Sequence, residues 1–166
     1  MRPTISIVLV ALIITAGQPT RANAQDVPVL AGVSTAKFEM EDLDAGGRRC
    51  GLNSNALLNA LKLPIRAYTK IHAITEGAEV PFFVLRVQTV AQKLRNETLC
   101  VSALVLQLNQ IALVDVPGQK PMLLTAMLWE GQRMISGALS DSPIRTMRTV
   151  ELLALEFAAQ WQTDNP

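Results

Sequence analysis

Residues 99–114, with the sequence LCVSALVLQLNQIALV, decide the fold class of this 166-residue chain. Leu104, Leu106 and Leu108 alternate with smaller or polar residues along this segment. Successive side chains of a β-strand point to opposite faces, so the three leucines share one face. The pattern predicts a long strand whose leucine face lies against the core.

Further strands are predicted on both sides of this segment. Residues 81–91 (PFFVLRVQTVA) are rich in β-branched and aromatic side chains, and residues 68–75 have a weaker strand pattern. Residues 122–129 form the next predicted strand, and residues 130–132 (EGQ) resemble a hairpin turn into a strand over residues 134–139. Connections this short favour antiparallel neighbours, because a parallel pair needs a crossover of about a dozen residues or more.

Two segments have helical periodicity. Residues 52–63 place leucines and alanines on one side at 3.6-residue spacing, with Asn53 or Ser54 as a cap and Pro64 as the expected stop. The second helix is expected to begin at Ser142-Pro143, with the serine as its cap. Its apolar stripe consists of Ile144, Met147, Val150, Ala154, Phe157 and Trp161.

These elements predict an α+β fold. Its antiparallel sheet of four to five strands has both helices packed on one face, and the element order is α-β-β-β-β-α. The domain is expected to comprise residues 48–166. Residues 25–47 end in the breaker sequence Ala-Gly-Gly and are expected to be a mobile lead-in with at most one strand.

Residues 1–24 have the features of a cleavable signal peptide. Arg2 precedes an apolar run over residues 5–16, and Ala22-Asn23-Ala24 matches the small-x-small cleavage pattern. A run of about a dozen residues is shorter than the roughly 20 that cross a bilayer, although a retained membrane anchor is the alternative. The mature chain is expected to start at Gln25 in the periplasm or outside the cell.

The two cysteines, Cys50 and Cys100, are expected to form a disulfide. Export would place them in an oxidising compartment, where two cysteines allow a single intramolecular pairing. Such a bridge would stabilise the fold by roughly 4 kcal/mol in the chain-entropy model. The alternatives are two buried thiols or pairing between chains.

Charge and motif content exclude several classes of function. The chain has 15 basic and 14 acidic residues, and cleavage would remove two of the basic ones, Arg2 and Arg21. The mature chain would then be nearly neutral, which argues against nucleic-acid binding. His72 is the single histidine, so the sequence predicts no metal site, no cofactor and no catalytic residues. There is no G-x-S-x-G motif, and the acidic residues 39–44 lack the spacing of a calcium loop. No other run is long and apolar enough to span a membrane.

Several short motifs resemble those of other proteins. They are the Cys50-Gly51-Leu52 opening, residues 82–87, Trp129-Glu130, and the closing pattern Phe157-x-x-x-Trp161 followed by Asn165-Pro166. Together they resemble a functionally uncharacterised group of small exported bacterial proteins. The resemblance implies bacterial export and the helix–strands–helix order, and it implies no activity or site residues.

The sheet face opposite the helices is expected to be partly apolar. Its predicted members are Phe82, Val84, Val105, Met127 and Trp129. Because a solvated face normally alternates to clearly polar residues, this face is expected to be covered. A second copy, another protein or residues 25–47 could cover it, and a face left in water is the alternative.

The sequence therefore favours a non-catalytic exported binding domain of unknown ligand. Its partner would be another protein or a second copy of the chain. A small secreted enzyme or enzyme inhibitor with an unidentified site is the alternative.

Overall fold

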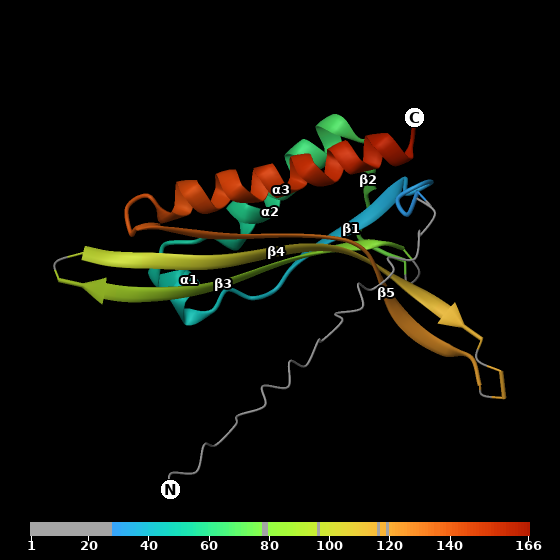
Figure 1. Cartoon of the computed structure of the whole chain (residues 1–166), viewed down its shortest axis with the longest axis horizontal. Helices are drawn as coiled ribbons and strands as arrows, with labels where there is room; N and C mark the ends of the chain where they lie inside the picture. Colours follow the sequence, from blue (N-terminus) through green and yellow to red (C-terminus); the bar gives the residue numbers. More distant parts are fainter. Residues whose placement is uncertain (1–27, 78–79, 96, 116, 119) are drawn as a thin grey trace, which may run out of the picture.

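A computed structural model of the chain describes residues 28–77, 80–95, 97–115, 117–118 and 120–166. They form a sheet with two long helices on one of its faces (Figure 1). The elements are β1 Thr35–Met40, α1 Ala45–Arg49, α2 Ser54–Tyr68, β2 His72–Ala73, β3 Phe82–Leu94, β4 Glu97–Val114, β5 Met122–Ala138 and α3 Ser142–Asp164. The α+β fold with two long helices on one sheet face is confirmed. The predicted signal peptide, residues 1–24, lies outside the described residues.

The sheet is mixed, which corrects the purely antiparallel expectation. Its strand order is β2-β1-β3-β4-β5. β1 runs parallel to both β2 and β3, whereas β3, β4 and β5 are antiparallel. The parallel pairing is possible because α1 and α2 separate β1 from the later strands and return the chain to the same end of the sheet.

The segment expected to be a mobile lead-in contributes to the core. β1 lies inside the sheet between β2 and β3. Leu30 and Ala36 are buried with the other core residues. Trp161 near the end of α3 donates a hydrogen bond from Nε1 to the carbonyl of Val33 at 2.9 Å. The domain therefore starts well before Arg48.

Helix α2 continues past Pro64, where the sequence pattern predicted its end. Asn53 caps the start by accepting a hydrogen bond from the amide of Ala56 at 3.0 Å. Pro64 deprives the helix of one backbone hydrogen bond, but the next turn places Ile65 in the core below Leu61. Burying Ile65 offsets the lost bond, since a buried isoleucine contributes about 1.5–3 kcal/mol.

Helix α3 follows most of its predicted stripe. Val150, Ala154, Phe157 and Trp161 are buried against the sheet and α2. Ile144 is the exception, with 53% of its surface exposed. The cap is Asp141, because Ser142 is already helical and buried.

The cysteines form the predicted disulfide. The α-carbons of Cys50 and Cys100 lie 6.1 Å apart, and both residues are buried. The bridge joins the chain just before α2 to the first part of β4.

Candidate functional site

Strands β4 and β5 extend beyond the rest of the sheet. The pairing of β3 with β4 ends at Phe82 and Asn109, so the last residues of β4 pair only with β5. We call residues 110–114 and 122–128 the arm. Figure 1 shows it as a two-stranded ribbon that leaves the body past the covering helices.

The arm exposes apolar side chains on both faces. Leu113 and Leu123, which pair across the ribbon, are 65% and 70% exposed. Leu124 on the opposite face is 46% exposed. The segments QIALV and MLLTAML contain no charged residue, and the flanking charges are Asp115 and Lys120. Contiguous apolar surface of this kind marks sites of association, unlike single apolar residues scattered over a surface.

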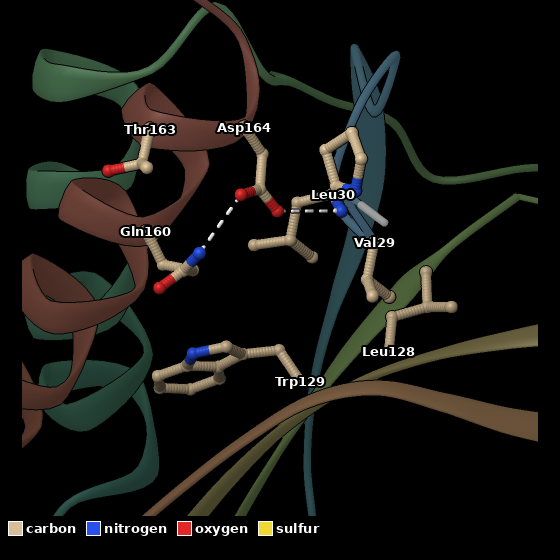
Figure 2. A pocket seen from close by; sticks show the side chains of 8 residues that line it. Val29, Leu30, Leu128, Trp129, Gln160, Thr163 and Asp164 are labelled. Atoms are coloured by element: carbon tan, nitrogen blue, oxygen red, sulfur yellow. Dashed lines mark hydrogen bonds between the residues drawn. The ribbon is translucent and has the colours of Figure 1, made fainter. Parts of the chain in front are cut away.

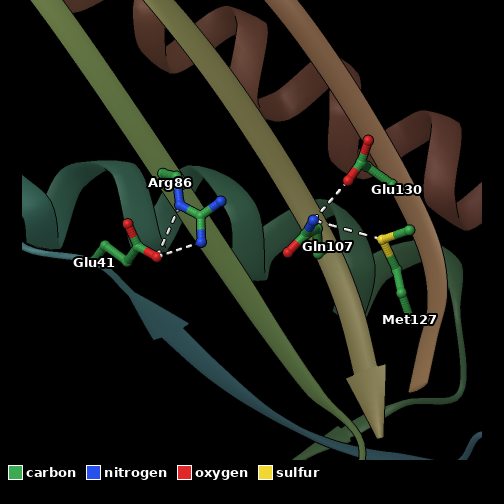
Figure 3. Close-up of polar contacts among 5 residues, drawn as sticks. All are labelled: Glu41, Arg86, Gln107, Met127 and Glu130. Carbon is green, nitrogen blue, oxygen red and sulfur yellow. Dashed lines mark hydrogen bonds and ion pairs between the residues drawn. The ribbon is translucent and has the colours of Figure 1, made fainter. Parts of the chain in front are cut away.

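The arm continues into the face of the sheet that the helices leave open, which we call the outer face. Phe82, Val84 and Val105 lie on this face and are half-buried. Met127 lies on the same side, where its sulfur is 3.5 Å from Nε2 of Gln107 (Figure 3). Four of the five residues predicted for an interaction face therefore share one surface with the arm.

Trp129, the fifth residue, lies on the helix-covered face instead. Its indole packs edge-on against Phe157 of α3, with ring centroids 5.4 Å apart. The prediction of its place was wrong because a β-bulge interrupts the alternation of β5. Trp129 pairs with Leu108 and Met127 with the adjacent Asn109, which leaves Leu128 as the extra residue.

The predicted hairpin over residues 130–132 is also absent, and β5 runs continuously from Met122 to Ala138. Gly131 is a strand residue that pairs with Leu106. Its lack of a side chain leaves room for the indole of Trp129, so the glycine marks a close approach and not a turn.

The polar side chains of the outer face bond to one another. Arg86 and Glu41 form an ion pair at 2.6 Å, and Gln107 donates a hydrogen bond to Glu130 at 2.6 Å (Figure 3). The hydrogen bond from Arg86 lowers the pKa of Glu41, and the same contact raises the pKa of Arg86. These groups therefore need no ligand to be satisfied, and the outer face offers a mixed polar and apolar surface.

The acidic residues 39–44 have structural roles as well. Asp44 accepts hydrogen bonds from the amides of Gly47, at 2.5 Å, and Thr89, at 2.9 Å. These backbone bonds lower the pKa of its carboxyl group. Asp44 thus caps α1 and ties it to β3, while Glu41 is paired to Arg86.

A cavity of about 540 Å³ lies between the start of the described chain, β5 and the end of α3 (Figure 2). Val29, Leu128 and Trp129 contribute its apolar wall. Asp164 accepts hydrogen bonds from the amide of Leu30 at 3.0 Å and from Gln160 at 2.9 Å. Both carboxylate oxygens are thus engaged in holding the structure together.

The histidine and the potential metal ligands among the described residues do not converge on one site. His72 is exposed on β2, in a pocket shared with Arg66 and Lys70 but with no carboxylate. Within the described ranges, no three histidine, cysteine or acidic residues are grouped as metal ligands. None of the helices described is both long and apolar enough to cross a membrane.

Comparisons with known proteins give only distant likenesses. No protein-family model matches the chain, and no curated protein matches it significantly. A minor lipoprotein from Acinetobacter baumannii is 10% identical with a TM-score of 0.38, over 81% of this chain and 94% of that one. A PelC dodecamer from Paraburkholderia phytofirmans is 12% identical with a TM-score of 0.42, over 79% and 87%. A hypothetical protein from Chlamydia trachomatis is 10% identical with a TM-score of 0.42, over 78% and 94%. At these values the likenesses assign neither a family nor a function.

Proposed function

We propose that this chain is an exported, non-catalytic binding domain that holds another protein chain through its arm and the adjoining outer face. The observation that carries the proposal is the arm itself, an uncharged ribbon with apolar side chains on both faces. Removing apolar surface from water is the main favourable contribution to most protein–protein association. The signal-peptide features of residues 1–24 and the Cys50–Cys100 disulfide support export.

The structure of the arm favours a protein partner over a lipid bilayer. A two-stranded ribbon has unpaired backbone N–H and C=O groups along both edges, and each costs several kcal/mol in hydrocarbon. The arm also ends in Asp115 and Lys120, so that a polar tip would have to enter the bilayer first. A neighbouring protein strand can instead pair with the edge of the arm while its side chains cover the apolar residues.

Residues 25–47 were offered by the sequence as a cover for the outer face, and in the described part, residues 28–47, Glu41 reaches that face beside Arg86. Lys37 to Met40 pair with the edge of β3, and Leu30 packs beside α3. Val29 lies near Leu128 at the base of the arm, but Leu113, Leu123 and Leu124 stay exposed.

Photo-crosslinking in the producing cells tests the proposal. A photoreactive phenylalanine analogue would replace Leu123 in the arm or, as the matched control, Ile144 on α3, which is also an exposed apolar residue. The Leu123 variant should form a discrete cross-linked product, and the Ile144 variant should not. The absence of a product from Leu123, or equal products from both positions, would contradict the proposal.

A further inference from the structure

We infer that the partner of the arm is the arm of a second copy of this chain. In this arrangement, the β5 strands of two copies pair antiparallel, edge to edge, about a two-fold axis at Thr125. The inference rests on the proposed function, since it names the occupant of the same site. The two copies would form one sheet that continues from body to body through the paired arms.

The edge of β5 is open for such pairing. β5 is the last strand of the sheet and pairs only with β4 among the described elements. Natural edge strands are usually protected by charged side chains or proline. β5 has charged residues in its body half, at Glu130 and Arg133, but residues 122–128 contain neither charge nor proline. A long, uncharged and unprotected edge is a template for another strand.

The sequence of the arm is complementary to itself in this register. With Thr125 on the axis, it meets Thr125 of the other copy, and cross-strand threonine pairs are favourable. Leu123 then lies opposite Met127, so two exposed apolar side chains cover each other. On the opposite face, Leu124 meets Ala126. No like charges face each other anywhere in the paired segment.

The flanking charges also fit the two-fold arrangement. Antiparallel pairing about Thr125 brings Lys120 of each copy near Glu130 of the other copy, with the bulge at Leu128 between Glu130 and the regularly paired segment. Both residues are exposed, so opposite charges would lie at each end of the apolar segment. Because the axis repeats the contact, charge complementarity at one end implies it at the other. Proline at position 121 has no N–H, so backbone pairing would end there and the hydrogen-bonded segment would be confined to the arm.

Cysteine crosslinking tests the register. Residues directly opposite in an antiparallel pair have Cβ atoms about 4.5–5.5 Å apart, close enough for a disulfide after small adjustments. Under mild oxidation Thr125→Cys should therefore link to itself between copies. Leu123→Cys is the matched control, because the two Leu123 positions would be about 13 Å apart along the strands. A mixture of Leu123→Cys and Met127→Cys proteins should form the mixed disulfide. Mass mapping would verify that the Cys50–Cys100 bridge stays intact.

Sedimentation of the mature protein measures the association itself. The protein should sediment as a dimer, and Leu124→Lys should increase its dissociation constant at least tenfold. Ile144→Lys, which adds the same charge at an exposed site on α3, should leave the dissociation constant unchanged. If both variants melt at the same temperature as the native protein, unfolding is excluded as the cause of weaker association.

Several results would overturn the second copy as partner. They are a monomer at every concentration tested, a dimer that Leu124→Lys does not weaken, or equal crosslinking by the Thr125→Cys and Leu123→Cys proteins. If the photoproduct from Leu123 contains a different protein, the inference fails while the proposed binding function stands. If the native protein floats with phosphatidylcholine–phosphatidylglycerol vesicles and the Leu124→Lys protein does not, both the second copy as partner and the proposed binding function would be overturned.

Discussion

The indole of Trp129 lies over Gly131, two residues further along the same strand. A Cβ atom at position 131 would be 2.5 Å from the ring and 3.0 Å from a methyl group of Leu153 on α3. The aromatic ring thus occupies the place of the missing side chain and extends to Phe157. This contact joins β5 to α3 at the point where the arm leaves the body.

The Gly131→Ala protein should be less stable than the native protein. The new methyl group has no free space, and overpacking of a core costs about 1–3 kcal/mol. Gly137→Ala is the matched control in the same strand, because its methyl group would meet the flexible side chain of Arg145, with Cδ at 3.1 Å. Urea unfolding monitored by circular dichroism gives both free energies. Equal losses in the two variants would contradict the proposed role of Gly131.

The Phe157→Ala protein should lose about 3–5 kcal/mol of unfolding free energy. Phe157 is buried and packs edge-on against both Phe83, at 4.8 Å between centroids, and Trp129. Ile144→Ala in the same helix should lose less than about 1 kcal/mol because more than half of the Ile144 surface is exposed. Thermal unfolding of both proteins checks the difference, and a large loss from Ile144→Ala would contradict the observed orientation of α3.

Removing the disulfide should cost about 2–5 kcal/mol of unfolding free energy. The double variant Cys50→Ala with Cys100→Ala leaves no unpaired thiol to react. Reduction of the native protein should lower stability by a similar amount, and reductant should have no effect on the double variant. Urea midpoints with and without dithiothreitol provide the measurement. A native protein insensitive to reductant under denaturing conditions would show that the bridge does not constrain the unfolded chain.

Acid should destabilise the protein partly through Asp44. Its pKa in the folded state lies below the ordinary value of 3.8, because its carboxylate accepts two backbone hydrogen bonds. Asp44 therefore contributes its full stabilisation above the pKa of the unfolded chain, and this contribution is lost as the pH falls through the lower pKa of the folded state. Asp44→Asn should be less stable near neutral pH and should lose less stability on acidification.

The measurement for Asp44 is the urea midpoint as a function of pH. Glu41, whose pKa is also lowered, is present in both proteins and cancels in the comparison. Asp44→Ala should in addition lose about 0.5–2 kcal/mol at neutral pH, since alanine cannot cap α1. Parallel pH profiles of the native and Asp44→Asn proteins would contradict this role.

The residue pattern determined the features that depend on nearest neighbours in the chain. The alternation of Leu104, Leu106 and Leu108 identified the buried face of β4, since strand side chains alternate whatever the strand pairs with. The three- and four-residue spacing of Val150, Ala154 and Phe157 identified α3, since residues at this spacing share one face of a helix whatever that helix packs against. Counting identified which cysteines would pair if an internal disulfide formed, because two cysteines allow only one internal pair.

The tertiary structure alone decided what depends on contacts between distant segments. β1 is part of the sheet because β3 and β2 flank it, and α2 passes Pro64 because the core accepts Ile65. The bulge beside Leu128 moved Trp129 to the helix side, where Phe157 and the space over Gly131 accommodate the ring. Local periodicity reports which residues share a face of one element. Pairing partners, register and bulges are chosen by packing energies summed over residues far apart in the chain, which no single segment encodes.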